Sequence, residues 1–223
     1  MPGVTISAGY GAGGSIIAPQ VAKRLGLPLL DRAISSHVAA QLHVSVQEAE
    51  GGAIRRSLVD RFLSVLEPLA GGALGAGTDC APPDAIPPPD DAAFFREQAE
   101  DIMTAALSTG AVILGRAGGA AFRDRPDVLR VRLFGPLEAR IAQAARIESV
   151  DPPVARQRLP EVDRARAQYV RRLYGVNIDD PAFYHLQLDS TVLALDACVD
   201  LITSAYAAHA GPRRPAVPET SRP

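Results

Sequence analysis

The N-terminal segment contains the pattern that most restricts how this chain can fold. The β-branched run Val4–Ser7 predicts a short strand, the segment Gly9–Ser15 predicts a glycine-rich turn, and the apolar residues Ile17, Val21 and Leu25 follow at helical spacing. A strand, a tight turn and an amphipathic helix form one unit of an α/β fold. Such a turn directs backbone N–H groups and the positive end of a helix toward one point, which suits a phosphate group.

The loop lacks the lysine that a phosphate loop usually carries. The usual loop ends in Gly-Lys-Ser or Gly-Lys-Thr, and its lysine reaches the β- and γ-phosphates. Here Gly13-Gly14-Ser15 stands at that position, and Ala8 replaces the first glycine. The only lysine of the chain, Lys23, lies about 13 Å further along the helix. Any cation for a phosphate must therefore be an arginine.

The loop residues themselves are candidates for binding the phosphates of ATP. Their backbone N–H groups would make the contacts, and the hydroxyl of Ser15 stands where a phosphate loop holds Mg²⁺. The alternative is a tight turn of an α/β domain that binds no ligand. The candidates for phosphate binding are Gly11, Ala12, Gly13, Gly14 and Ser15.

Five short apolar runs predict strands, and helical patterns separate them. This alternation predicts an α/β fold in which helices cover both faces of a parallel sheet. The strands are expected at Val4–Ser7, Leu27–Leu30, Ala111–Leu114, Val128–Phe134 and His185–Leu188. Helices are expected over residues 33–50 and 54–66 and at Phe94–Leu107, Leu137–Ile147 and Ala194–Ala207.

One domain over residues 1–210 accounts for these elements, and two stretches stand apart from it. Residues 71–91 contain too much glycine and proline to pack, which predicts a flexible surface loop. Residues 211–223 form a Pro/Arg/Ser segment that predicts a disordered tail.

Composition limits the classes of partner. A net charge of −2 gives no whole-chain reason to expect nucleic acid or an anionic membrane as a partner. The N-terminus lacks a secretory signal pattern, and no apolar run approaches the ~18 residues that a membrane span needs. Cys80 and Cys198 lie far apart and outside any metal-binding spacing, which favours a reduced, cytoplasmic setting. The oligomeric state is not predicted.

Two polar residues follow predicted strands, where parallel sheets bind ligands. Asp31 ends the second strand and Arg116 follows the third. Asp31 could face a ligand or cap the next helix, since aspartate is a favoured N-cap. Arg116 could grip a phosphate with two hydrogen bonds or be an ordinary surface arginine.

An arginine-rich helix is predicted over residues 160–172. Arg164, Gln168 and Arg171 share one face of it, and apolar residues such as Val162 occupy another. Arg164 and Arg171 would stand roughly 10 Å apart along the axis, enough to span a transferring phosphoryl group and its neighbours. The alternative is a solvated face paired with nearby acidic residues.

Several short motifs follow one another in a fixed order. They are Ile6-Ser7, Tyr10-Gly11-Ala12-Gly13-Gly14, Leu25-Gly26-Leu27-Pro28 before Asp31-Arg32, Val112-Ile113-Leu114-Gly115-Arg116, Pro136-Leu137-Glu138-Ala139-Arg140, Asp163-Arg164 with Tyr169, Tyr174-Gly175, Asp180-Pro181 with Tyr184-His185-Leu186, and Leu188-Asp189-Ser190-Thr191. Their order and spacing over most of residues 4–206 resemble the cytidylate kinase-like family, a branch of the phosphate-loop nucleoside monophosphate kinases.

The resemblance implies a three-layer α/β fold of the P-loop NTPase type with a five-stranded parallel sheet, and small-molecule nucleotides as partners. A helical insertion over residues 33–110 would bind the acceptor, and a lid over residues 150–180 would carry arginines. The activity would be ATP-dependent phosphoryl transfer, with Mg²⁺, to a nucleoside monophosphate (CMP-like) or a similar small acceptor. The residues leave two alternatives open: a weakly active or inactive nucleotide-binding regulatory module, and a scaffold that binds a protein partner.

The resemblance also implies roles for single residues. Asp31 and Arg116 would face the acceptor nucleotide. The catalytic cations would be arginines of the lid and of the helix before it, which could offset the missing lysine because a well-placed arginine can supply ~10³–10⁵ in rate. These arginines are Arg164, Arg171 and Arg140.

Overall fold

The computed structural model describes residues 3–31 and 92–210 of the chain. Five strands form one parallel sheet, which confirms the predicted fold class. The strands are β1 (Gly3–Ala8), β2 (Leu29–Leu30), β3 (Val112–Leu114), β4 (Val128–Phe134) and β5 (Leu186–Asp189). The predicted helices at 33–50 and 54–66, the loop at 71–91 and the tail at 211–223 lie outside the described residues.

The strand order places the glycine loop at the centre of the sheet. The order is β2-β3-β1-β4-β5, so β1 lies between β3 and β4. Ile6 pairs with Leu114 of β3, and Ser7 pairs with Arg132 of β4. Because all strands are parallel, their carboxyl ends share one edge, and ligands of open α/β sheets bind outside that edge.

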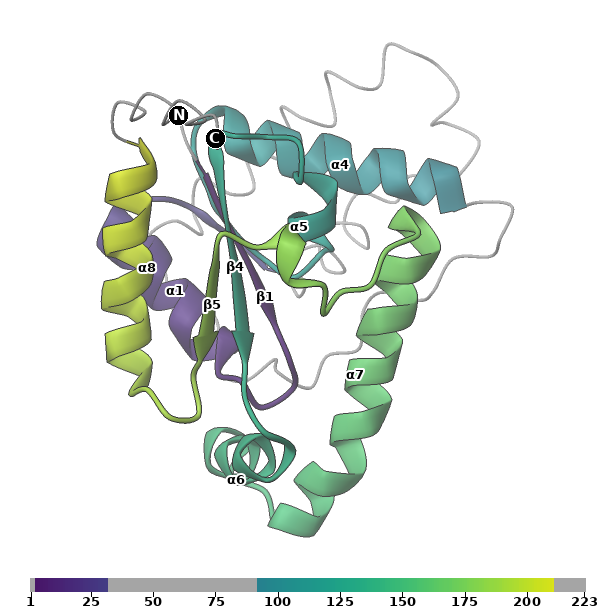
Figure 1. Ribbon diagram of the computed structural model, residues 1–223, viewed down its shortest axis with the longest axis vertical. Helices are drawn as coiled ribbons and strands as arrows, with labels where there is room; N and C mark the ends of the chain where they lie inside the picture. Colours follow the sequence, from purple (N-terminus) through teal and green to yellow (C-terminus); the bar gives the residue numbers. More distant parts are fainter. Residues whose placement is uncertain (1–2, 32–91, 211–223) are drawn as a thin grey trace, which may run out of the picture.

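Helices cover both faces of the sheet and its carboxyl edge (Figure 1). The described helices are α1 (Gly14–Leu25), α4 (Ala92–Ser108), α5 (Gly118–Ala121), α6 (Leu137–Glu148), α7 (Pro152–Tyr174), the short 3₁₀ helix η4 (Pro181–Phe183) and α8 (Leu195–Ala210). The arginine-rich segment is the second half of α7, which starts at Pro152 because proline suits the first turn of a helix. None of the described helices is long and apolar enough to cross a membrane.

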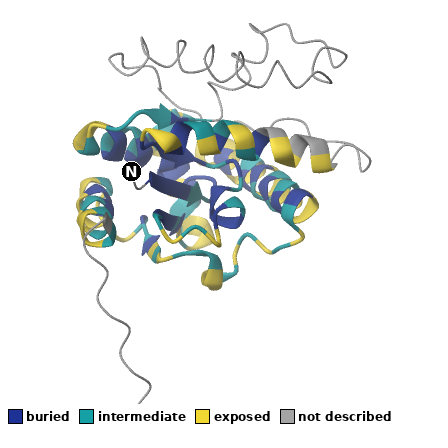
Figure 2. Cartoon of the chain, turned by 90° about the horizontal axis from the view of Figure 1, so that it is seen from above, coloured by how far each residue is buried: buried dark blue, intermediate teal, exposed yellow. Residues whose placement is uncertain are grey.

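One face of the sheet is apolar and packs against α1 and α8. Val4 and Ile6 of β1 and Val131 and Leu133 of β4 are fully buried in this cluster, with Val199 of α8 among their partners. Figure 2 shows the buried residues gathered in the sheet and on the sides of the helices that face it. This cluster holds α1 in position, so the start of the helix is fixed relative to the strand before it.

The opposite face carries polar side chains on the same two strands. Because side chains alternate along a strand, Thr5 and Ser7 of β1 and Arg130 and Arg132 of β4 point away from the apolar cluster toward α5 and α7. Arg130 is 7% exposed and donates to the carbonyl oxygens of Phe122, Arg125 and Phe183. This face is therefore polar close to the carboxyl edge of the sheet.

The helix α1 ends with its basic residues exposed. Gly26 follows it with φ +65°, and its N–H bonds to the carbonyl oxygens of Ala22 and Lys23. Lys23 is exposed in the last turn. The only lysine therefore lies at the far end of α1 from the glycine loop, as the sequence predicts.

Candidate functional site

The glycine loop, residues 9–15, is buried along its whole length. Gly11 and Gly13 have φ of +73° and +71°, in the left-handed region that favours glycine. A Cβ on Gly11 would lie 2.2 Å from the carbonyl oxygen of Arg140, and a Cβ on Gly13 would lie 2.9 Å from Cδ2 of Leu195. Both glycines are therefore required by the backbone and by the approach of α6 and α8, independently of any ligand.

Side chains from two other elements hold the carbonyl groups of the loop. Gln143 Nε2 of α6 donates to the carbonyl oxygen of Gly11 at 3.0 Å. The hydroxyl of Ser190, directly after β5, donates to the carbonyl oxygen of Ala12 at 2.7 Å. Residues far along the chain thus hold the main chain of the loop in this conformation.

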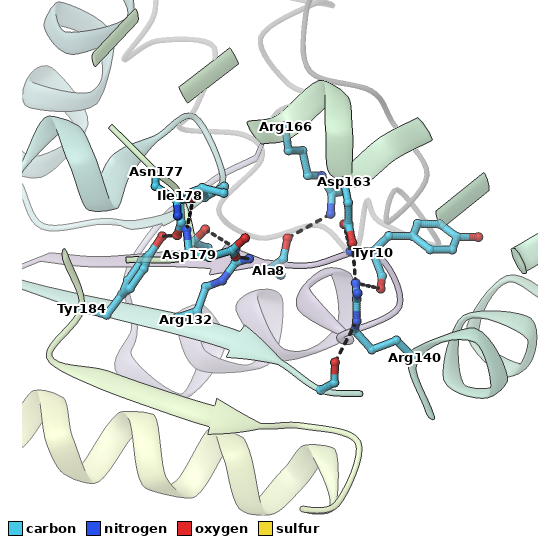
Figure 3. A network of polar contacts seen from close by, with 12 residues as sticks. Ala8, Tyr10, Arg132, Arg140, Asp163, Arg166, Asn177, Ile178, Asp179 and Tyr184 are labelled. Atoms are coloured by element: carbon cyan, nitrogen blue, oxygen red, sulfur yellow. Dashed lines mark hydrogen bonds and ion pairs between the residues drawn. The ribbon is translucent and has the colours of Figure 1, made fainter. Parts of the chain in front are cut away.

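Arg140 and Asp163 bind the main chain of Tyr10 (Figure 3). The N–H of Tyr10 donates to Asp163 Oδ1 at 2.8 Å, and Arg140 Nη1 donates to the carbonyl oxygen of Tyr10 at 3.0 Å. Arg140 Nη1 also contacts Asp163 Oδ2 at 2.6 Å, and its Nε donates to the carbonyl oxygen of Gly135 at 3.0 Å. We call Tyr10, Arg140 and Asp163 the Tyr10 clamp.

The ring of Tyr10 anchors the loop between α6 and α7. It is fully buried, and its hydroxyl donates to Glu148 Oε2 at 2.8 Å. Around it lies an apolar cluster from the two helices, which contains Ile141, Ala144, Ala155, Leu159 and Val162. The loop, α6 and the first half of α7 therefore pack as one unit.

Three arginines from three elements line a pocket beside the loop. Arg132 comes from β4, Arg140 from α6 and Arg166 from α7. Arg166 Nη1 donates to the carbonyl oxygen of Ala8 at 2.9 Å, and Arg132 Nη1 donates to Ser7 Oγ at 2.9 Å. The pocket is lined by Ala8, Gly9, Arg132, Phe134, Gly135, Arg140, Asp163, Arg166, Ile178 and Asp179.

The charges that line this pocket favour an anion. Its three guanidinium groups face two carboxylates, Asp163 and Asp179, which leaves one positive charge in excess. Arg132 Nη2 contacts Asp179 Oδ1 at 2.5 Å, and the side chain of Asp179 is 68% exposed. Guanidinium groups bind phosphate and carboxylate oxygens with paired hydrogen bonds. The pocket can therefore hold a phosphoryl group next to the carboxyl end of β1.

The predicted catalytic arginines lie in different places. Arg140 lines the pocket, whereas Arg164 and Arg171 are exposed on α7. The buried side of α7 includes Val162, Arg166, Val170 and Leu173, so Arg166 is the arginine of this helix that faces the sheet. The catalytic role of Arg164 and Arg171 stays a prediction.

Sequence reasoning missed Arg132, Arg166 and the contacts of Asp163. A signal for Arg166 exists, because it lies four residues after Val162 and four before Val170, at the spacing of one helix face. A signal for Arg132 exists too, because it alternates with buried residues along β4. Charged residues are rarely assigned to a buried face, since burial without a partner is costly.

The two predicted acceptor-binding residues lie on the other side of β1. Asp31 follows β2 and Arg116 follows β3, and neither is among the residues that line the pocket. Gly115, Arg116 and Ala117 have φ of +78°, +54° and +55°. A left-handed conformation is unfavourable for residues with a side chain and is often found at functional sites. Arg116 is held there with 8% of its surface exposed.

Ser15 has a position that suits a magnesium ion carried by a nucleotide. It lies in the first turn of α1 and is 6% exposed. Within residues 3–31 and 92–210, no group of three or more His, Cys, Asp or Glu residues could hold a metal ion by itself. Mg²⁺ in nucleotide sites is usually held by one or two protein groups together with phosphate oxygens, and the role of Ser15 stays a prediction.

A comparison with models of protein families identifies the family of this chain. The model of a family described as "Cytidylate kinase-like family" matches residues 3–192. The chain belongs to the cytidylate kinase-like family. This match confirms the resemblance found in the motifs, and it includes the glycine loop, the pocket and α7.

Individual relatives match over shorter stretches or at low identity. A cytidylate kinase from Methanopyrus kandleri is 30% identical over 82 residues, which are 36% of this chain and 42% of that protein. A uronate isomerase from Corynebacterium glutamicum is 26% identical over 112 residues, which are 50% of this chain and 21% of that protein. The chain thus covers less than half of each curated relative. An uncharacterized protein from Eubacterium ventriosum shares the fold, with a TM-score of 0.59, 16% identity and coverage of 93% of this chain and 99% of that one.

Proposed function

We propose that this member of the cytidylate kinase-like family transfers a phosphoryl group from ATP to a nucleoside monophosphate, CMP-like, or to a similar small acceptor. The observation that carries the proposal is the convergence of Arg132, Arg140 and Arg166 beside the glycine loop. A nucleotide kinase needs positive charge at this edge of the sheet, and the loop itself supplies no lysine. The family and its kinase relatives support the same class of reaction.

Catalysis would consist of positioning and charge neutralisation. Phosphoryl transfer needs little acid–base chemistry from side chains. Most of its catalysis comes from positioning the reactants and from cations that neutralise the charge on the transferring group. Arg140 and Arg166 would stabilise the phosphates near Gly9, and Arg132 would supply a third cation from the sheet. Ser15 would hold the magnesium ion, which would neutralise negative charge on the phosphates.

The acceptor would bind on the β3 side of the loop. Asp31 and Arg116 follow the two strands on that side, and Arg116 is held there in an unfavourable backbone conformation. Donor and acceptor phosphates would then meet near the end of β1. Arg116 would lie on one side of them and the three pocket arginines on the other. Arg164 and Arg171 are exposed on α7 and are second candidates for contacting the transferring group after movement of that helix.

A nucleotide-binding regulatory module is the second candidate. The observation that favours it is the Tyr10 clamp, because Asp163 already bonds to an N–H of the glycine loop and to Arg140. A site in which the Asp163 carboxylate already occupies these donors could bind a nucleotide weakly without catalysing phosphoryl transfer. The two candidates therefore differ in turnover and not in where the nucleotide binds.

The deciding experiment is a product screen with purified protein, ATP, Mg²⁺ and a panel of nucleoside monophosphates and other small hydroxyl acceptors. We expect a phosphorylated product, detected by ³¹P NMR or chromatography, with at least one acceptor. Protein with Arg132→Gln, purified in the same way, controls for a contaminating kinase. Retained ATP binding without any product would contradict the kinase and favour the regulatory module.

A further inference from the structure

Asp163 makes two contacts that a phosphate oxygen would otherwise make. One carboxylate oxygen accepts the N–H of Tyr10 in the glycine loop at 2.8 Å, and the other accepts from Arg140 Nη1 at 2.6 Å (Figure 3). The side chains of Arg140 and Asp163 are only 14% and 30% exposed. Arg140 and Asp163 line the pocket together with Arg132 and Arg166, and Tyr10 directly follows Gly9, which also lines it.

A carboxylate and a phosphoryl group compete for the same donors. Both present negatively charged oxygens, and both bind backbone N–H groups of glycine loops and guanidinium groups with short, charge-assisted hydrogen bonds. Each oxygen of Asp163 uses one such donor. A phosphate that enters the pocket can bind Arg166 and Arg132 directly, but it reaches the Tyr10 N–H and the full charge of Arg140 only where Asp163 has moved away.

We propose that Asp163 is a built-in competitor for the phosphate site, so that a phosphate-bearing ligand binds by displacing its carboxylate from the Tyr10 clamp. The proposal rests on the proposed function, since it names how ligands of that same pocket are admitted. Asp163 would then lower the affinity of the pocket for phosphate-bearing ligands. Ligands with more negative charge would displace its carboxylate more readily. A polyphosphate meets that demand better than a neutral or singly charged ligand.

Contacts other than those of Asp163 also attach α7 to α6. Arg156 of α7 pairs with Glu138 of α6, and Arg158 of α7 pairs with Glu148 of α6. The apolar cluster around the ring of Tyr10 joins the same two helices. The carboxylate can therefore leave the clamp while α7 stays on the protein, as a change of side-chain conformation or a small shift of the helix.

The test uses Asp163→Asn in the full chain. The variant removes the charge and keeps a side-chain oxygen that can accept the Tyr10 N–H. The affinities for inorganic phosphate and for ATP are measured by isothermal titration calorimetry. We expect both ligands to bind at least ~10-fold more tightly than to the wild type, a difference of ~1.4 kcal/mol.

The matched control is Glu138→Gln. It makes the same chemical change in another carboxylate that joins α6 to α7, but Glu138 does not line the pocket. We expect the control to change either affinity by less than ~2-fold, because an exposed ion pair contributes little. Asp163→Ser provides a second way to remove the carboxylate, and far-UV circular dichroism shows which variants are folded.

The outcomes separate this proposal from the proposed function. Unchanged or weaker binding of both ligands to the folded Asp163 variants would overturn the competitor, and so would a gain of equal size in Glu138→Gln. Failure of every protein to bind phosphate or ATP would overturn it as well. If Asp163→Asn binds more tightly but the product screen shows no turnover, the role of Asp163 as a competitor is supported and the kinase activity is rejected. If turnover occurs and the affinity of Asp163→Asn is unchanged, only the role of Asp163 as a competitor is rejected.

Discussion

The two faces of the central sheet use the same strands for different purposes. On one face, Val4, Ile6, Val131 and Leu133 form a fully buried apolar contact with α1 and α8. On the other, the alternate residues of the same two strands include two hydroxyls and two arginines, with Ser7 accepting from Arg132 at 2.9 Å. Of these four polar residues, Arg132 lines the pocket and Arg130 is bound to carbonyl groups of the protein itself.

The arginines of the polar face are buried at a cost in free energy that their hydrogen bonds must offset. Burying an arginine is unfavourable unless its hydrogen bonds are satisfied, and Arg130 meets that condition with three carbonyl groups. Arg132 and Arg166 also have partners, yet both keep a place at the wall of a pocket. Under the proposed function, these two arginines would bind the phosphates of the ligand.

The largest effect is expected on the apolar face, from Leu133→Ala. This side chain is 0% exposed in the core, and truncation of a buried leucine costs about 2–5 kcal/mol of unfolding free energy. Urea denaturation followed by circular dichroism measures the loss. Arg132→Met, one residue away on the polar face, is expected to cost about 1 kcal/mol and to weaken ATP binding instead. Equal stability losses in the two variants would break the comparison.

The second effect concerns the two sides of α7. Arg166→Gln removes the inward arginine, and we expect kcat/KM to fall at least ~10²-fold, about 2.7 kcal/mol of transition-state stabilisation. Arg164→Gln and Arg171→Gln, on the exposed side, are expected to lower it less. Steady-state kinetics with the acceptor found in the product screen measures all three variants. A larger loss at Arg164 or Arg171 than at Arg166 would show that the exposed arginines contact the transferring group.

The smallest expected effect is a pH dependence of the free energy of unfolding, and it involves His185, which does not line the pocket. Burial lowers the pKa of His185, and the charge of Arg130 and the ring of His209 lower it further. The folded protein therefore binds this proton less readily than the unfolded chain, whose histidine titrates near pH 6.5. The stability from neutral His185 is complete above that pH and is lost as the pH falls toward the lowered pKa of the folded state.

The measurement is the free energy of unfolding between pH 7.5 and 5.5. We expect it to fall on the acid side by at most about 1.4 kcal/mol per pH unit, the limit for one proton. His185→Asn should reduce this slope, because it removes the titrating group and keeps an acceptor for the N–H of Arg130, which now bonds to Nδ1 of His185 at 3.3 Å. Because His185 does not line the pocket, ATP affinity should not follow the same titration. An unchanged slope in the variant would assign the pH dependence to other groups.

The fold could be predicted from sequence because local signals agree with the global arrangement. The strand expected at Val128–Phe134 is β4 to the residue, since its alternation is strong and turn-forming residues flank it. The helix expected at Leu137–Ile147 ends one residue later, at Glu148. Parallel order follows from the helices between the strands. These features depend on periodicity, which a single sequence displays.

The pocket was only partly predictable because it depends on contacts between distant residues. Arg140 was named from the resemblance, but its bonds to Tyr10, Gly135 and Asp163 join three segments that no periodicity connects. The spacing of Arg166 from Val162 and Val170 indicates the buried face of its helix, but nothing local shows that the carbonyl oxygen of Ala8 would accept a hydrogen bond from it. The partner of Arg166 therefore became clear only in three dimensions.

The position of Lys23 also makes the protein easy to label. Amine-reactive dyes and surface-coupling reagents attack lysines and the terminal amine, and this chain offers them one exposed lysine, in the last turn of α1. A fluorophore or a sensor surface attached there would lie at the far end of the helix from the glycine loop, with the pocket left open. Conversely, nucleotide probes that react with the usual phosphate-loop lysine would not mark this site, so a survey of kinases based on such reagents would miss this protein even if it is fully active.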